Sequence, residues 1–160
     1  MLSSMKTAAV AALDAHEIAW AAPLVTSLER ARPGASLDWS LASFERILPT
    51  LESTNAQTLA WLAGLRDMWE RARQGEVSSE EPARVARAIW EQPGRNPAQT
   101  ALHRLYSALA ARIRGMSREA AQDVNLAMDV IVRHPSFSRD LAEIMLSRFD
   151  EHMERAQQGQ

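Results

Sequence analysis

The chain has 160 residues, of which 46% are hydrophobic and 24% charged, and its formal net charge is −2. This length predicts one domain, and this composition is typical of globular proteins and excludes intrinsic disorder. The absence of cysteine excludes disulfides, thiolate zinc sites, iron–sulfur clusters and cysteine nucleophiles. A slightly negative charge also argues against a general nucleic-acid binder, which is expected to be basic.

The first predicted helix covers residues 4–31 and ends before Pro33 and Gly34. Apolar side chains repeat at helical spacing along it, although Pro23 should kink or split it. Acidic residues interrupt its apolar start, which is shorter than the roughly 18 apolar residues that cross a membrane. We therefore expect a helix rather than a targeting segment, and no membrane partner.

Caps and stops divide the rest of the chain into six further amphipathic helices, over residues 36–51, 54–75, 78–92, 96–115, 117–134 and 138–156. Capping-box patterns begin those at Thr54 and Ser78, and Asn96 precedes a first-turn Pro97. No segment alternates like a strand. The sequence thus predicts an all-α bundle of about seven helices in a single domain, residues 1–156, and a frayed tail at 157–160.

Apolar stripes on these helices predict a core, with seven side chains expected to be mostly buried: Leu41, Phe44, Leu48, Leu62, Trp69, Leu109 and Phe149. Trp39 lies nearly opposite the stripe of its own helix. A tryptophan in such a position either packs against a second layer of helices or is an exposed anchor for a partner. We favour the second layer and keep the anchor as the alternative. Trp61 and Trp90 lie toward stripe edges.

Candidate catalytic and metal-binding groups are few. On a continuous first helix Glu17 falls inside the apolar stripe, where burial would raise its pKa and make it a candidate acid. A carboxylate paired with arginine or placed at the core rim is the interpretation we favour. The four histidines lie on four different helices or their ends, without the i, i+3 or i+4 partners of a bundle metal site. We predict no catalytic residues, no metal, no cofactor and no enzyme activity.

Acidic residues gather on one side of the last predicted helix, opposite its apolar stripe: Asp140, Glu143, Asp150, Glu151 and Glu154. A solvated helix face is one interpretation of this pattern. The other is a docking surface for a basic partner, because a charged face accelerates encounter and selects register. We predict that these five residues, together with Trp39, form the partner-binding site.

Residues 69–84 read Trp-Glu-Arg-Ala-Arg-Gln-Gly-Glu-Val-Ser-Ser and continue to Ala83-Arg84. In this segment an Ala-rich helix bearing a Trp ends in Gly-Glu before a short loop and another Ala/Arg helix. It resembles a segment of the small all-helical bacterial immunity proteins that accompany polymorphic toxins. The resemblance implies a protein that binds and neutralises a cognate toxin, with no catalytic residues to carry over.

We therefore predict a cytoplasmic, non-enzymatic interaction protein, an immunity- or antitoxin-like inhibitor whose partner is another protein such as a basic toxin domain. The alternative is a helical binding domain for a small-molecule effector, with a pocket lined by Trp and Met. Large enclosed apolar cavities would favour the alternative, whereas a continuous core with an exposed acidic groove would favour the interaction protein.

Overall fold

The computed structural model describes residues 2–17, 19–51, 54–134 and 136–159, which hold nine α-helices, one 3-10 turn and no strand. In chain order these elements are α1 (Leu2–Asp14), α2 (Ala22–Ala31), α3 (Ala35–Ile47), η1 (Leu48–Thr50), α4 (Ala56–Arg73), α5 (Glu80–Trp90), α6 (Pro97–Ile113), α7 (Ser117–Val132), α8 (Arg139–Ser147) and α9 (Phe149–Gln157). The prediction of an all-α bundle is confirmed.

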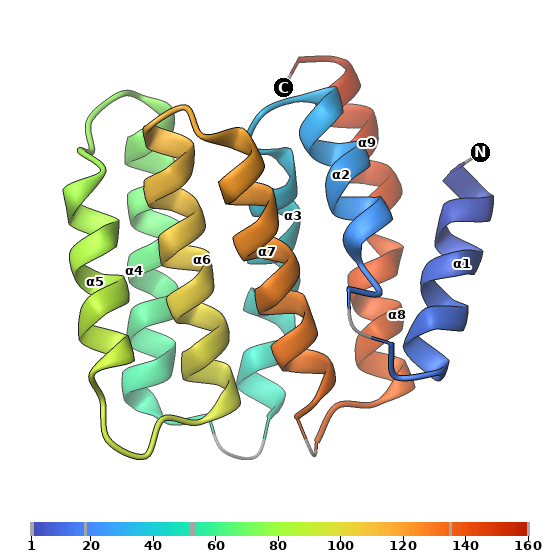
Figure 1. Ribbon diagram of the computed structural model, residues 1–160, viewed down its shortest axis with the longest axis horizontal. Helices are drawn as coiled ribbons and strands as arrows, with labels where there is room; N and C mark the ends of the chain where they lie inside the picture. The colour runs from blue at the N-terminus through green and yellow to red at the C-terminus, as the bar shows by residue number, and fades with distance from the viewer. Residues whose placement is uncertain (1, 18, 52–53, 135, 160) are drawn as a thin grey trace.

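Most of the helices run up and down beside one another and connect at the two ends of the bundle, whereas α9 continues in the direction of α8 (Figure 1). α6 packs between α5 and α7, and α3 contacts α7, α8 and α9. α2 packs against α3, α7 and α9, while α1 lies at the edge of the bundle. Short connections between antiparallel neighbours favour this arrangement.

Local capping accounts for several helix starts. Asn96 and Gln99 form the reciprocal capping box, with the Gln99 N–H 2.9 Å from Asn96 Oδ1, and Pro97 occupies the first turn. The N-cap of α4 is Asn55 rather than Thr54, because the Asn55 side chain accepts the Thr58 N–H at 2.9 Å. These side chains satisfy N–H groups that have no partner inside the helix.

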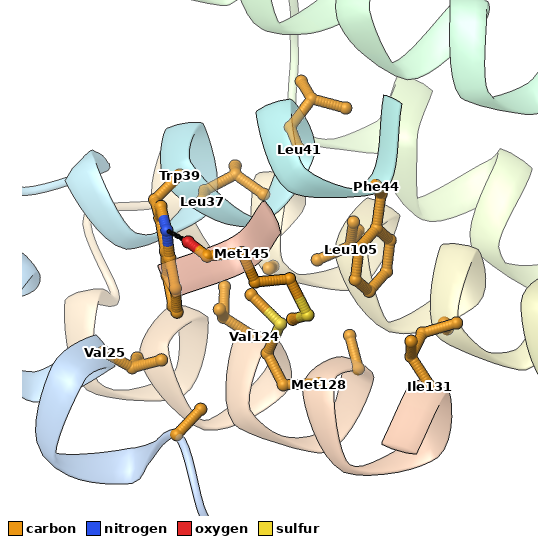
Figure 2. Packing of buried hydrophobic residues seen from close by; sticks show 14 of the residues in the cluster. Val25, Leu37, Trp39, Leu41, Phe44, Leu105, Val124, Met128, Ile131 and Met145 are labelled. Atoms are coloured by element: carbon orange, nitrogen blue, oxygen red, sulfur yellow. Dashed lines mark hydrogen bonds between the residues drawn. The ribbon is translucent and has the colours of Figure 1, made fainter. Parts of the chain in front are cut away.

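One hydrophobic cluster draws on every α-helix of the described chain. All seven core side chains predicted from the stripes are buried. Figure 2 shows Phe44 and Leu105 facing Met128 and Ile131 in the middle of the bundle. Burial of this apolar surface is the main force that holds the helices together.

The first predicted helix is two helices, because α1 ends at Asp14 and α2 begins at Ala22. Between them His16 and Ala19 adopt positive φ angles of 55° and 63°. The Asp129 carboxylate of α7 accepts the Ala19 N–H at 2.7 Å. This hydrogen bond from a neighbouring helix stabilises the turn. Pro23 lies in the first turn of α2, where its missing N–H costs nothing.

The last predicted helix is also divided, at Arg148, into α8 and α9. Near the break the carbonyl oxygen of Met145 accepts a hydrogen bond from the Trp39 indole, 2.9 Å away. A side chain that inserts into the hydrogen-bond ladder is a known cause of helix interruption. α9 reaches Gln157, and the N–H groups of Gln158 and Gly159 donate to the carbonyl oxygens of Glu154 and Ala156 at 3.1 Å. The fraying of residues 157–160 stays a prediction. Residue 160 lies outside the described residues.

None of the described helices has the length and apolar character needed to cross a membrane.

Candidate functional site

Trp39 is not an exposed anchor, and this part of the predicted partner-binding site is wrong. Its side chain is fully buried and donates a hydrogen bond to the Met145 carbonyl (Figure 2). It also packs edge-to-face on Phe149, with ring centroids 5.8 Å apart. The side of α3 opposite its stripe is covered by α8 and α9, so a second layer of helices fills the position. A buried indole cannot contact a partner without opening the bundle.

Glu17 does not lie in an apolar stripe. The helix on which that prediction depended ends at Asp14, and Glu17 is exposed in the following turn. Its carboxylate is therefore in contact with solvent and does not lie among apolar side chains. The interpretation of Glu17 as a buried acid is wrong.

The five acidic residues of the predicted site are exposed, but they lie on two helices rather than one. Asp140 and Glu143 lie on α8, and Asp150, Glu151 and Glu154 lie on α9. All five side chains are exposed. The continuous core beneath these helices leaves their charged sides to solvent.

Three of the five carboxylates have a basic neighbour. Asp150 pairs with Lys6 of α1 at 3.0 Å, Glu151 with Arg155 at 3.7 Å, and Glu143 with Arg139 at 4.0 Å. Exposed pairs of this kind contribute only about 0–1 kcal/mol and exchange readily with another partner. Within the described part of the chain, Asp140 and Glu154 have no such neighbour.

A cleft of about 730 Å³ opens at the end of the bundle drawn uppermost in Figure 1, where α2, α4, α6 and α9 end and α3 begins. We name it the Gly34 cleft, and its lining residues are Arg32, Pro33, Gly34, Ala35, Asp38, Trp69, Glu70, Ala72, Arg73, Gln74, Gly75, Val77, Arg112, Ile113, His152, Arg155 and Ala156. The lining contains Trp69 but no methionine. The cleft is thus not the Trp/Met-lined pocket of the alternative prediction.

Gly34 shapes the cleft by bringing the α2–α3 turn against Trp69. Its φ is +92°, and a Cβ at this position would lie 2.8 Å from Cη2 of Trp69 and 3.1 Å from Nε of Arg112. Glycine is therefore required here both for the left-handed backbone and for the close approach. A larger residue would push the turn away from the α4 wall.

Asp38 is the centre of a polar network on one wall. Its carboxylate accepts the Trp69 indole N–H at 3.1 Å and lies 3.6 Å from both Arg66 and His152. The Nδ1 of buried His152 lies 2.9 Å from the Arg148 carbonyl, and its Nε2 lies 3.0 Å from a guanidinium nitrogen of Arg155. Since carbonyls only accept and guanidinium groups only donate, the neutral Nδ1–H tautomer satisfies both contacts.

A second polar cluster surrounds Trp90, which is 48% exposed at the end of α5. The Arg95 guanidinium carbon lies 3.9 Å from the centre of the Trp90 rings, and the His103 ring lies 4.9 Å away on centroids. His103 Nδ1 contacts the Ala86 carbonyl at 2.8 Å. Burial lowers the pKa of His103, and the nearby cations Arg104 and Arg95 lower it further, against the opposing effect of that hydrogen bond.

Sequence reasoning missed the Gly34 cleft, because its residues come from four helix ends and one turn that are distant along the chain. The sequence signal that could have pointed to the cleft is the recurrence of an arginine or a Pro-Gly turn at the end of a predicted helix. No group of three or more His, Asp or Glu side chains within the described ranges is arranged to hold a metal ion. Comparison with protein-family models, curated proteins and solved structures finds no match.

Proposed function

We propose that this protein is a non-enzymatic interaction protein that binds a basic partner protein through the exposed acidic face of α8 and α9. The observation that carries the proposal is the exposure of Asp140, Glu143, Asp150, Glu151 and Glu154 on two consecutive helices. The resemblance of residues 69–84 to bacterial immunity proteins supports a toxin as the partner, and a cytoplasmic site of action.

Electrostatics gives this face a specific role in binding. Exposed carboxylates attract a basic surface over about 8–10 Å at physiological salt, which raises the rate of encounter. Asp140 and Glu154 are the best placed for this role, since neither is neutralised by a described neighbour. The paired residues on the same face exchange a weak internal contact for an intermolecular one at little cost.

The arrangement of the core supports protein binding over an enclosed effector site. Trp20, Trp39, Met128 and Met145 are buried in one continuous hydrophobic cluster. Their side chains are used to pack the helices together, as Figure 2 shows for the last three.

Co-expression with the protein encoded by the adjacent reading frame tests the proposal in cells. We expect the adjacent product to arrest growth and the wild-type chain to relieve the arrest. The variant Asp140→Lys/Glu154→Lys should relieve it poorly, because two attractive charges become repulsive. The matched control Glu91→Lys/Glu119→Lys makes the same change in net charge at two exposed positions, the C-cap of α5 and the first turn of α7, and should protect as well as wild type.

Two results would contradict the proposal. One is an adjacent product that leaves growth unchanged both with and without this chain. The other is equal protection by the two double variants, at equal protein levels and with cooperative unfolding of both. In that second case the acidic face is only a solvated surface.

A further inference from the structure

We infer that the Gly34 cleft is a binding site for a small organic oxyanion, whose carboxylate or phosphate group is held by Arg32 and Arg112. This inference goes beyond the proposed function, because it concerns another surface and a ligand of the opposite charge. It can therefore fail or succeed independently of the acidic face.

The lining has an excess of positive charge. Four arginines, Arg32, Arg73, Arg112 and Arg155, face two carboxylates, Asp38 and Glu70. These six side chains together carry a net charge of +2. An anion that enters the cleft would therefore be attracted.

The two carboxylates are already engaged, Glu70 by Arg73 of the lining at 3.7 Å and both by Arg66, which lies outside the lining. Arg66 lies 3.6 Å from Asp38 and 3.2 Å from Glu70, and it also forms a 2.6 Å pair with Glu45. Asp38 additionally accepts the Trp69 indole N–H. The carboxylates of the cleft therefore have little capacity left to neutralise Arg32 and Arg112.

Arg32 and Arg112 are the uncompensated cations. Within the described residues, neither guanidinium has an ion-pair partner. Nε of Arg112 is buried and makes no hydrogen bond in that part of the chain. A buried donor without a partner costs free energy, and a guanidinium held beside a carboxylate or phosphate forms paired, charge-assisted hydrogen bonds.

Three of the four arginines in the lining lie near the C-termini of helices. Arg73, Arg112 and Arg155 lie in the last turns of α4, α6 and α9, where the helix dipole favours positive charge. The N-terminus of α3 does not compete for the anion, because Glu29 already occupies it. Oε1 of Glu29 accepts the N–H groups of Gly34 and Ser36 at 3.0 and 3.2 Å. The arginine side chains are thus the donors left for a ligand.

The dimensions favour a small molecule over a macromolecular surface. A volume of about 730 Å³ falls within the roughly 300–1,000 Å³ range of small-ligand sites. Trp69, Val77 and Ile113 contribute apolar surface to the otherwise charged lining. An organic anion with an apolar portion therefore matches the cleft better than an inorganic ion.

Isothermal titration calorimetry of the full chain, with citrate and with inorganic pyrophosphate at constant ionic strength, tests the inference. We expect saturable one-site binding of at least one of them, and the preference between the two identifies carboxylate or phosphate as the recognised group. Arg112→Gln and Arg32→Gln should each weaken binding about tenfold or more. Arg87→Gln is the control, since Arg87 is exposed on α5 and absent from the lining. It should change affinity less than about twofold.

Arg32 is the C-cap residue of α2 and does not lie inside a helix. Arg32→Gln therefore tests the inference even if Arg112→Gln fails to fold. Three outcomes would overturn the inference. They are no saturation by either anion up to about 10 mM, equal weakening by Arg87→Gln and Arg32→Gln, or saturable binding of a tetraglutamate peptide alone. The last result would assign the cleft to a protein segment.

Discussion

The indole nitrogen of Trp39 donates a 2.9 Å hydrogen bond to the carbonyl oxygen of Met145, which lies 106 residues further along the chain. The bond, drawn in Figure 2, joins α3 to α8. Met145 lies close to Arg148, where the last helical segment divides. The same indole packs edge-to-face against Phe149, the first residue of α9. One side chain thus contacts both helices that carry the acidic face, and it fixes how they sit on the core.

Substitution of Trp39 separates the hydrogen bond from the packing. Trp39→Phe keeps an aromatic ring but leaves the Met145 carbonyl without the indole donor, which should cost about 1–3 kcal/mol of unfolding free energy. Trp39→Ala also removes a large buried ring and should cost about 3–5 kcal/mol. Urea denaturation followed by circular dichroism measures both values. Equal losses for the two variants would show that the indole N–H rather than ring packing is what matters.

The Gly34 turn provides a matched pair of glycine substitutions. Gly34→Ala combines a left-handed backbone with a 2.8 Å contact to Trp69, whereas Gly75→Ala has a φ of +75° and open space around the added methyl group. We expect Gly75→Ala to cost about 1 kcal/mol from backbone strain alone. Gly34→Ala should cost at least about 2 kcal/mol, because overpacking adds to that strain. Thermal or urea unfolding compares the two, and an equal loss would show that the α2–α3 turn shifts freely away from α4.

His103 should make stability depend on pH. Burial lowers its pKa in the folded protein, so the unfolded chain takes up a proton at a higher pH than the folded chain does. The stabilising contribution of neutral His103 is therefore present above its unfolded pKa of about 6.5 and is lost as pH falls through the lowered folded pKa.

Urea unfolding at about pH 7.5 and pH 5.5 measures this effect. Wild type should lose more stability between the two pH values than His103→Gln, which has no group to titrate at that position. A larger loss in the variant would contradict the burial of the imidazole beside Trp90.

Much of the fold follows from local patterns in the sequence. Asn96 before Pro97 and Ser138 before α8 act as N-caps in the structure. The apolar spacing of Leu41, Phe44 and Leu48 correctly predicts the buried side of the third helix. Such features depend on neighbouring residues, so they can be read from one segment at a time.

Long-range contacts account for what the sequence could not reveal. The end of α1 lacks a glycine, and the turn that follows is held by Asp129 more than a hundred residues later. Trp39 looks misplaced on its own helix because its partners, Met145 and Phe149, come from α8 and α9. The Gly34 cleft likewise appears only when four helix ends come together.

The exposure of the five acidic residues could be predicted, since it depends on the apolar side of the same segment. Their ion pairs could not, because Lys6 reaches Asp150 only through the packing of α1 beside the C-terminal helices. Those pairs make Asp140 and Glu154 the informative positions for substitution.

Association kinetics with the partner protein test the central claim most directly. Stopped-flow mixing should show a rate constant for wild type that falls steeply between low salt and about 150 mM salt. At low salt Asp140→Lys/Glu154→Lys should associate at least about tenfold more slowly, with a flatter salt dependence and a nearly unchanged dissociation rate. Glu91→Lys/Glu119→Lys should behave like wild type. An unchanged association rate for Asp140→Lys/Glu154→Lys at low salt would contradict docking on the α8–α9 face.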